Sequence, residues 1–368
     1  MKLSNRESIC LDLIRAVASQ AVVIGHGIGF FGILKFLHEP NFPWMQNIAV
    51  VVFFILSGFV ITYSTIIKSG SSEYTFFDFF ADRASRIFSA YLVAIIFVIA
   101  IDAFSMLIDD SSYYYKSAFN IQTLVANLFM LQDYPLYEFL GVKGLHETSF
   151  GSARVFWTIS IEWWIYMFFG VLFFCILKYE KPTLIKLILL AVSAVVVSWY
   201  TYDSRGEHLS LFWCLGMGWM LIYRKYRENV TGLYANLVVL SSSLATCIAI
   251  QFSVVNGYNL YFALSLSLVI VSLVNTANYM TLEKFKRIIE LVAGYSFTLY
   301  LVHYSIMDFM SQHIESKNGY TAFICALLIS NGVAMFIAKF SERSLRRTFK
   351  RYIYKARDAV TRPEVLGN

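Results

Sequence analysis

The sequence predicts an all-α integral membrane protein, on the evidence of its composition, its long apolar stretches and the distribution of its basic residues. Hydrophobic residues make up 58% of the 368 residues and charged residues only 15%, whereas a soluble domain carries about 25% charged residues. A soluble protein of this composition could not cover its surface with polar side chains. Intrinsic disorder is excluded as well, because it needs few apolar residues and a high net charge.

Ten apolar stretches are candidates for membrane-spanning helices, which need about 20 mainly apolar residues. They are 9–31, 46–66, 87–108, 155–177, 183–200, 208–223, 233–253, 258–276, 290–311 and 320–341. The sixth stretch is short, so we expect it to be tilted, buried or partly interfacial. The segment 120–132 is shorter still and amphipathic, and we expect it to lie in the membrane interface as part of the long loop 109–154.

The distribution of Lys and Arg predicts the orientation of these spans. If the N-terminus is cytosolic and the spans alternate, 23 Lys and Arg residues fall in cytosolic segments and six in outer segments. This asymmetry is the positive-inside pattern. The sequence therefore predicts about ten transmembrane helices with both termini in the cytosol. The net charge of +6 arises from this pattern, and we expect no nucleic-acid partner.

The chain divides into a transmembrane domain, residues 1–341, and a basic cytosolic tail, residues 342–368. Apolar residues recur in the tail at helical spacing, which predicts an amphipathic helix on the anionic inner leaflet of the bilayer. The N-terminal apolar run contains Asp12 and Arg15, so it is a first span and not a cleaved signal peptide. The five cysteines have irregular spacing and predict neither a disulfide framework nor a metal site.

Polar residues are concentrated on one face of the first span. Asp12, Arg15 and His26 share this face, and Arg15 lies about 16 Å along the helix axis from His26. A charged residue in mid-membrane costs at least about 2.5–3.5 kcal/mol on insertion scales and is usually functional or paired. We expect Arg15 to bind an anion near the inner end and His26 to titrate in the outer half. The alternatives are an interfacial Asp12–Arg15 ion pair and a histidine that is bonded to a neighbouring helix.

Glu162 interrupts the fourth span at a depth similar to that of His26. A Glu–His pair would orient the imidazole and raise its basicity, as a general base requires. The alternative is a structural carboxylate that is bonded to backbone or to a tyrosine.

Two arginines precede the third span, in the segment RASR. Arg83 and Arg86 are spaced i,i+3 at a helix start, so both side chains can point the same way. Guanidinium groups suit phosphate, and the alternative is that both residues only anchor the span. In the ninth span, Ser296, Tyr300 and His303 share one face, which predicts either cavity-lining residues or helix–helix hydrogen bonds. We expect Gly58 and Gly294 to allow close helix packing.

Five motifs in order resemble the acyltransferase-3 family of integral membrane proteins, over about residues 8–341. They are LDLIRAVASQAVVIGH, VVFFILSGFVIT, RASR, FWTISIEWWIYMF and AGYSFTLYLVHY. The resemblance implies transfer of acetyl or related acyl groups from cytosolic acyl-CoA to hydroxyls, mostly on cell-surface sugars. It also implies the stand-alone type, without the fused SGNH hydrolase-like domain that some members carry.

The resemblance assigns roles to the matched positions. It implies that His26 is the catalytic base, that Arg15 is its partner in an Arg-x10-His motif, and that Glu162 is the acidic residue of the fourth-span motif. Arg83 and Arg86 match an RxxR motif and are expected to help bind the CoA phosphates. The resemblance leaves the role of Ser296, Tyr300 and His303 open.

We therefore expect a membrane O-acyltransferase, more narrowly an O-acetyltransferase, in the bacterial cytoplasmic (inner) membrane. It would use acetyl-CoA or another acyl-CoA as co-substrate, with no permanently bound cofactor. The acceptor would be a lipid-linked saccharide or a surface glycan such as lipopolysaccharide or exopolysaccharide. One alternative is a secondary transporter or lipid-linked-sugar carrier in which Arg15, His26 and Glu162 form a proton relay. A second alternative is a non-catalytic membrane scaffold.

Overall fold

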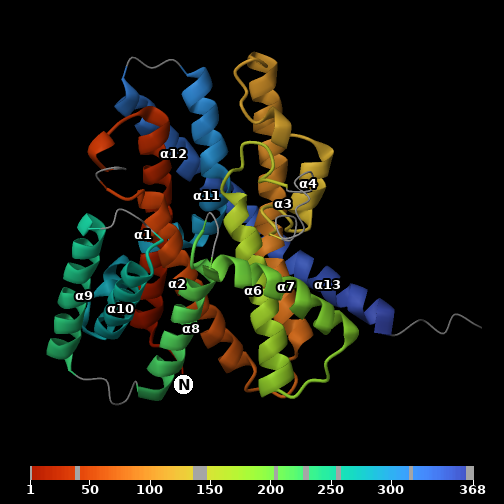
Figure 1. The fold of residues 1–368 in the computed structure, drawn as a ribbon, viewed down its shortest axis with the longest axis vertical. Helices are drawn as coiled ribbons and strands as arrows, with labels where there is room; N and C mark the ends of the chain where they lie inside the picture. The colour runs from red at the N-terminus through yellow and green to blue at the C-terminus, as the bar shows by residue number, and fades with distance from the viewer. Residues whose placement is uncertain are drawn as a thin grey trace, which may run out of the picture.

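The computed structural model describes residues 2–37, 42–135, 147–202, 206–226, 232–253, 258–314 and 318–361, and every regular element in these ranges is helical (Figure 1). A helix covers most or all of each of the ten predicted stretches. These helices are α1 (Asn5–Phe31), α2 (Met45–Lys68), α3 (Phe76–Ile108), α6 (Phe156–Leu172), α7 (Leu184–Tyr202), α8 (Leu209–Tyr226), α9 (Leu233–Ser253), α10 (Leu260–Thr276), α11 (Lys286–His313) and α12 (Gly319–Ala338). The segment predicted as interfacial contains the short α4 (Ile121–Leu128).

Eight of the described helices are long and apolar enough to cross a membrane. They are α1, α2, α3, α6 with the π-helical turn Phe173–Leu177, α7, α9, α10, and α12 with its continuation to Ala359. The helices α8 and α11 form where two more spans are predicted but are not among these eight. The all-helical membrane class is confirmed, whereas the number of spans and the side of the termini stay predictions.

The helix α3 begins at Phe76, eleven residues before the predicted span. Thr75 caps it, since its hydroxyl accepts from the backbone N–H of Asp78 while the Asp78 carboxylate accepts from the N–H of Thr75. This reciprocal arrangement is a capping box, which fixes a helix start. Arg83 and Arg86, expected at the start of a helix, therefore lie further inside it.

Contacts at the two ends of the bundle agree with the predicted alternation of spans. The start of α1 meets the segment before α11, where Arg6 Nε donates to Glu283 Oε1 at 2.9 Å. This hydrogen bond holds the pKa of the Glu283 carboxyl below its ordinary value. At the other end, α3 meets α11 through Ser105 Oγ and His313 Nε2, which are 2.6 Å apart. Segments that are expected on one side of the membrane thus contact each other.

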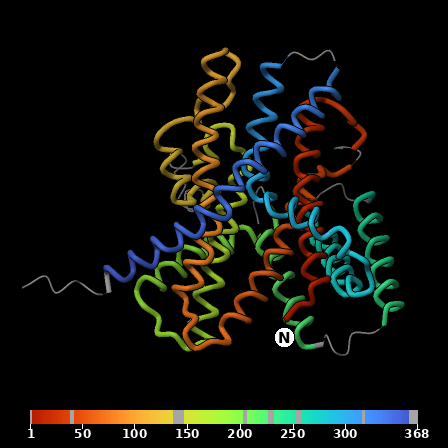
Figure 2. The backbone as a smooth tube through the Cα atoms, turned by 180° about the vertical axis from the view of Figure 1, so that it is seen from behind, coloured from red at the N-terminus to blue at the C-terminus, as the bar shows by residue number. Residues whose placement is uncertain are grey.

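The tail is helical over α13 (Arg346–Thr361) and follows a π-helical stretch, Lys339–Leu345. It lies obliquely across α3 (Figure 2). The Asp82 carboxylate, whose side chain is 5% exposed, accepts from Lys68 and from Lys350 at 2.5 Å each. Tyr354 Oη donates to Asp78 Oδ1, also at 2.5 Å. The tail is therefore fastened to the start of α3, while residues 362–368 lie outside the described ranges.

Two glycines let α2 and α8 cross closely. A Cβ atom on Gly58 would collide with the carbonyl oxygen of Trp213, and one on Gly216 with that of Ile55. The prediction of close packing is confirmed at Gly58. It is wrong at Gly294, where no described neighbour would lie within 4 Å of a Cβ atom, because this position of α11 faces open space.

Candidate functional site

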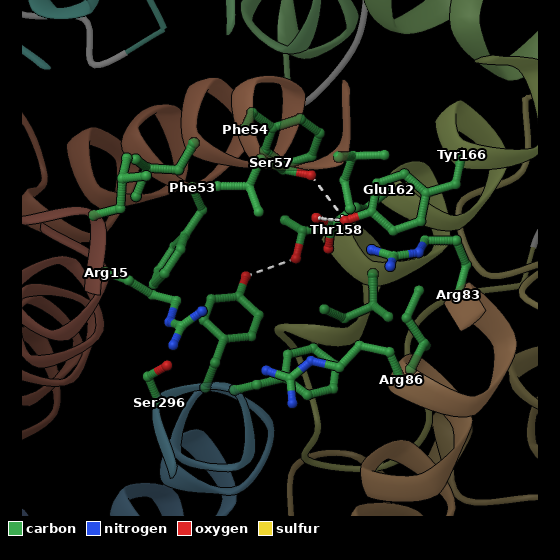
Figure 3. A pocket seen from close by; sticks show the side chains of 18 of the residues that line it. Arg15, Phe53, Phe54, Ser57, Arg83, Arg86, Thr158, Glu162, Tyr166 and Ser296 are labelled. Carbon is green, nitrogen blue, oxygen red and sulfur yellow. Dashed lines mark hydrogen bonds between the residues drawn. The ribbon is translucent and has the colours of Figure 1, made fainter. Parts of the chain in front are cut away.

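A cavity of about 330 Å³ lies between α1, α2, α3, α6 and α11. Seven of the nine residues singled out in the sequence line it: Asp12, Arg15, Arg83, Arg86, Glu162, Ser296 and Tyr300. The two histidines, His26 and His303, are not among the described residues of the lining. Figure 3 shows Arg15 on one side of the cavity and Arg83 and Arg86, both from α3, on the other. The tertiary structure thus joins four segments that are far apart in the sequence.

The cavity extends along the helices from the end predicted to be cytosolic. Leu3 and Ser8, near the start of α1, belong to the lining, as does Tyr63, near the end of α2. At the other extreme, the lining includes Phe53 and Tyr300, which lie further toward the predicted outer side on α2 and α11. The space is therefore elongated, and arginines lie along much of it.

Two of the three arginines have a carboxylate partner. Arg15 Nη2 lies 2.8 Å from Asp12 Oδ1, so the expected i,i+3 ion pair is present on the cavity wall. Arg86 Nη1 lies 2.5 Å from Glu342 Oε2. A guanidinium group has five N–H donors, and one carboxylate leaves donors for a further ligand. These pairs are therefore compatible with anion binding.

Glu342 is a buried residue of this site that sequence reasoning missed. Its side chain is 5% exposed, and its carboxylate also accepts from the backbone N–H and hydroxyl of Thr298, at 3.2 and 2.8 Å. The sequence placed position 342 at the beginning of the basic amphipathic tail on the inner leaflet. The signal that could have found it is a single acidic residue at the start of a strongly basic segment, just beyond the last span.

Arg83 differs from the other two arginines. No described carboxylate forms an ion pair with it, and its guanidinium carbon lies 6.0 Å from the ring centre of Phe79. Its buried Nε, like that of Arg15, has no hydrogen-bond partner among the described residues. In Figure 3 its side chain extends toward Glu162. A buried N–H without a partner is costly. Arg83 is therefore the arginine best placed to gain from an incoming anion.

Glu162 is tied to a tyrosine, which was the alternative considered for it. Tyr166 Oη donates to Glu162 Oε1, and Tyr166 Oη lies 2.8 Å from Ser57 Oγ. Ser57 Oγ accepts in turn from Trp213 Nε1 at 3.2 Å. This network crosses α6, α2 and α8 and holds the carboxylate on the cavity wall (Figure 3). The contacts favour Tyr166, and not His26, as the partner of Glu162.

A layer of three side chains separates the cavity from the two histidines. Tyr300 Oη and Thr158 Oγ1 are 2.6 Å apart, and the rings of Phe53 and Tyr300 meet edge to face at 5.9 Å. Beyond this layer, the ring centre of His303 lies 6.0 Å from that of Tyr300 and 5.3 Å from that of His26. The site therefore has an arginine-lined part and a histidine part on either side of Tyr300.

The loop that follows α3 is fastened beside the histidine part. Asp102 accepts from Tyr113 Oη at 2.6 Å and from Ser152 Oγ at 2.5 Å. Burial and the neighbouring Asp102 carboxylate raise the pKa of Tyr113. Further along, Tyr115 Oη lies 3.3 Å from Tyr304 Oη. The described part of this loop thus forms a fixed wall on the predicted outer side.

Comparison with known proteins identifies one family and one relative. A family model described as an acyltransferase domain matches residues 8–339. The relative is an O-acetyl transferase of Shigella phage Sf6, 31% identical over 170 residues. The match covers 45% of this chain and 46% of that protein, which is less than half of each. No solved structure matches the chain.

Proposed function

Because the chain belongs to the acyltransferase-3 family, we propose that it is a membrane O-acyltransferase. It moves an acyl group from cytosolic acyl-CoA to a hydroxyl of a cell-surface or lipid-linked glycan. The name of the phage relative supports acetyl as the group that is transferred. The proposed location is the bacterial cytoplasmic membrane, in line with the apolar helices and the basic segments at one end.

The observation that carries the proposal is the elongated cavity with arginines along its wall. CoA combines a bulky anionic nucleotide with a long and thin pantetheine arm. Arg83 and Arg86 would hold phosphates near the cytosolic mouth, since guanidinium groups bind phosphate through paired N–H donors. The arm would then extend past Arg15 toward Tyr300. This arrangement brings the thioester to the layer that borders the histidines.

His26 is the proposed general base. A rotation of the Tyr300 side chain would let the thioester carbonyl approach His26, while the acceptor hydroxyl enters from the predicted outer side. His26 takes the hydroxyl proton, the oxygen attacks the carbonyl carbon, and the carbon–sulfur bond breaks. The leaving thiolate recovers the proton from His26. Positioning both reactants in one enclosed site supplies a further part of the rate enhancement.

The test compares histidine variants in a host whose surface glycan carries the ester. We expect His26→Ala to abolish O-acetylation, measured by mass spectrometry of the glycan. His313→Ala is the matched control, because His313 bonds Ser105 at the far end of α11 and is not part of the site. Unchanged acetylation with His26→Ala, at equal protein level, would overturn His26 as the base. With the purified protein in lipid vesicles, uptake of a sugar into the vesicles and no formation of an ester from acyl-CoA would support the transporter alternative instead.

A further inference from the structure

One ring nitrogen of His303 has a fixed protonation state. His303 Nδ1 lies 3.0 Å from the carbonyl oxygen of Leu299 and 2.9 Å from that of Tyr300. Both oxygens can only accept, so Nδ1 carries the proton and donates. In a neutral imidazole the other nitrogen is then an acceptor. The backbone of α11 therefore leaves a lone pair on His303 Nε2.

This lone pair is buried, and no described residue donates a hydrogen bond to it. His303 is 0% exposed, and its Nε2 has no hydrogen bond among the described residues. Leaving a buried acceptor without a hydrogen bond costs free energy. The position therefore calls for a donor that arrives in a functional state of the protein.

The ring of His26 is the neighbour that can supply this donor. Its centre lies 5.3 Å from that of His303, and the two rings are tilted by 40°. Tyr300 and Tyr304 are also close, but each hydroxyl already has a hydroxyl partner, Thr158 and Tyr115 respectively. A modest rotation of the half-buried His26 ring brings an N–H of His26 onto His303 Nε2.

We propose that His303 is a positioning residue, whose Nε2 accepts a hydrogen bond from one ring nitrogen of His26 and so fixes the other nitrogen of His26 as the one that acts as the base. This inference rests on the proposed function. The hydrogen bond made by one ring nitrogen decides which nitrogen of a histidine carries the proton. When His26 takes the acceptor's proton, its N–H donates more strongly, and the neutral His303 stabilises the imidazolium. A carboxylate could do the same, but a charge at this depth costs more than a neutral ring.

The experiment measures the reactivity of His26 directly, without any acceptor. Diethylpyrocarbonate acylates the unprotonated nitrogen of imidazole, and mass spectrometry of the purified protein gives the labelling rate of His26. Three substitutions of His303 separate its two nitrogens. His303→Gln keeps an acceptor near the place of Nε2, His303→Asn keeps a donor near the place of Nδ1 without that acceptor, and His303→Leu has neither.

We expect His303→Asn and His303→Leu to lower the His26 labelling rate about tenfold, by analogy with the lower end of the loss that follows when a metal-ligating histidine loses its hydrogen-bond partner. His303→Gln should keep most of the wild-type rate, and the control His313→Gln should keep all of it. Size-exclusion chromatography and CoA binding report on folding of each variant. A wild-type rate in folded His303→Asn would overturn the proposal. An equal loss in all three His303 variants would also overturn it, since packing and not the acceptor would then matter.

The outcome is independent of the proposed enzymatic activity. If labelling follows the expected order while His26→Ala cells still acetylate their glycan, the hydrogen bond between His26 and His303 is supported and the assignment of His26 as the base is overturned. If His26→Ala abolishes acetylation but the His26 labelling rate does not change in the His303 variants, His26 is supported as the base and its hydrogen bond with His303 is overturned.

Discussion

Arg86 on α3, which lines the cavity, and Glu342 in the π-helical stretch after α12 form a 2.5 Å ion pair. The Glu342 side chain is 5% exposed and that of Arg86 is 28% exposed. Water can therefore replace part of the ion pair for Arg86 but little of it for Glu342. The pair joins the cavity to the last segment of the bundle.

Replacing Arg86 should therefore destabilise the protein. Arg86→Ala leaves the Glu342 charge buried without its counter-ion, which costs about 3–5 kcal/mol. Adding Glu342→Gln to Arg86→Ala should recover most of this loss, since the amide oxygen can still accept from Thr298. The measurement is the thermal unfolding midpoint in detergent. Equal midpoints for wild type and Arg86→Ala would contradict the interpretation.

Arg83→Ala should weaken donor binding while leaving the unfolding midpoint unchanged. Hydrogen bonds to charged groups contribute about 1.5–3 kcal/mol, so the Kd for acetyl-CoA should rise roughly 10- to 100-fold. Isothermal titration calorimetry measures this change. Acetyl-pantetheine, which has no phosphate, serves as the control ligand and should bind both proteins equally. A parallel loss for both ligands would show that Arg83 contacts the arm of the donor and not a phosphate.

Glu162→Gln should leave the reaction of His26 with diethylpyrocarbonate unchanged. The Glu162 carboxylate accepts from Tyr166, and a glutamine oxygen can replace it there. If Glu162 were the partner of His26, its loss would slow the labelling as much as the loss of the His303 acceptor. The labelling assay thus decides between the pair expected from the sequence and the pair seen in the structure.

Gly58 and Gly294 give a pair of glycine-to-alanine variants with opposite expected effects on packing. Gly58→Ala drives a Cβ atom into the backbone carbonyl of Trp213, and such overpacking costs about 1–3 kcal/mol. Gly294→Ala meets no described neighbour within 4 Å and should be neutral, or stabilising by up to about 1 kcal/mol through helix propensity. Thermal unfolding midpoints of the two variants test this. A larger loss for Gly294→Ala would mean that its face of α11 is covered.

Asp82→Asn should release the tail helix from α3. The substitution removes the charge that Lys68 and Lys350 share, so α13 should open more often and become sensitive to trypsin. Inside-out and right-side-out membrane vesicles show on which side the cuts occur. We expect cleavage in inside-out vesicles only. Cleavage in right-side-out vesicles would contradict a cytosolic tail.

Much of the site could be predicted because charge in an apolar helix is expensive. That rule singled out Arg15 and Glu162, and the structure places both on one cavity. The rule fails for Thr158, whose hydroxyl matters only because Tyr300 lies opposite it. It also fails for Glu342. A carboxylate beyond the last span carries no insertion cost that the sequence could reveal, and only the π-helical turn directs this one into the bundle. Helix ends followed local signals, as the Thr75–Asp78 capping box shows.

The contacts of the site residues were harder to predict than their depth in the membrane. His26 and Glu162 lie at similar depth along their helices, and depth alone suggested a pair. Helix rotation decides which rings meet, and rotation depends on contacts such as those between α1 and α11. These contacts place His26 against His303. Glu162 instead bonds Tyr166, one turn further along its own helix α6.

The layer formed by Phe53, Thr158 and Tyr300 matters for the electrochemical gradient across the membrane. An arginine-lined passage that crossed the bilayer without interruption would conduct ions and protons and dissipate the electrochemical gradient. The hydrogen bond between Thr158 and Tyr300 lies between the arginine-lined part and the histidine part. If the arm of the proposed donor displaces Tyr300, it would itself fill the opening that it makes. Acyl groups could then cross the membrane without a leak of ions.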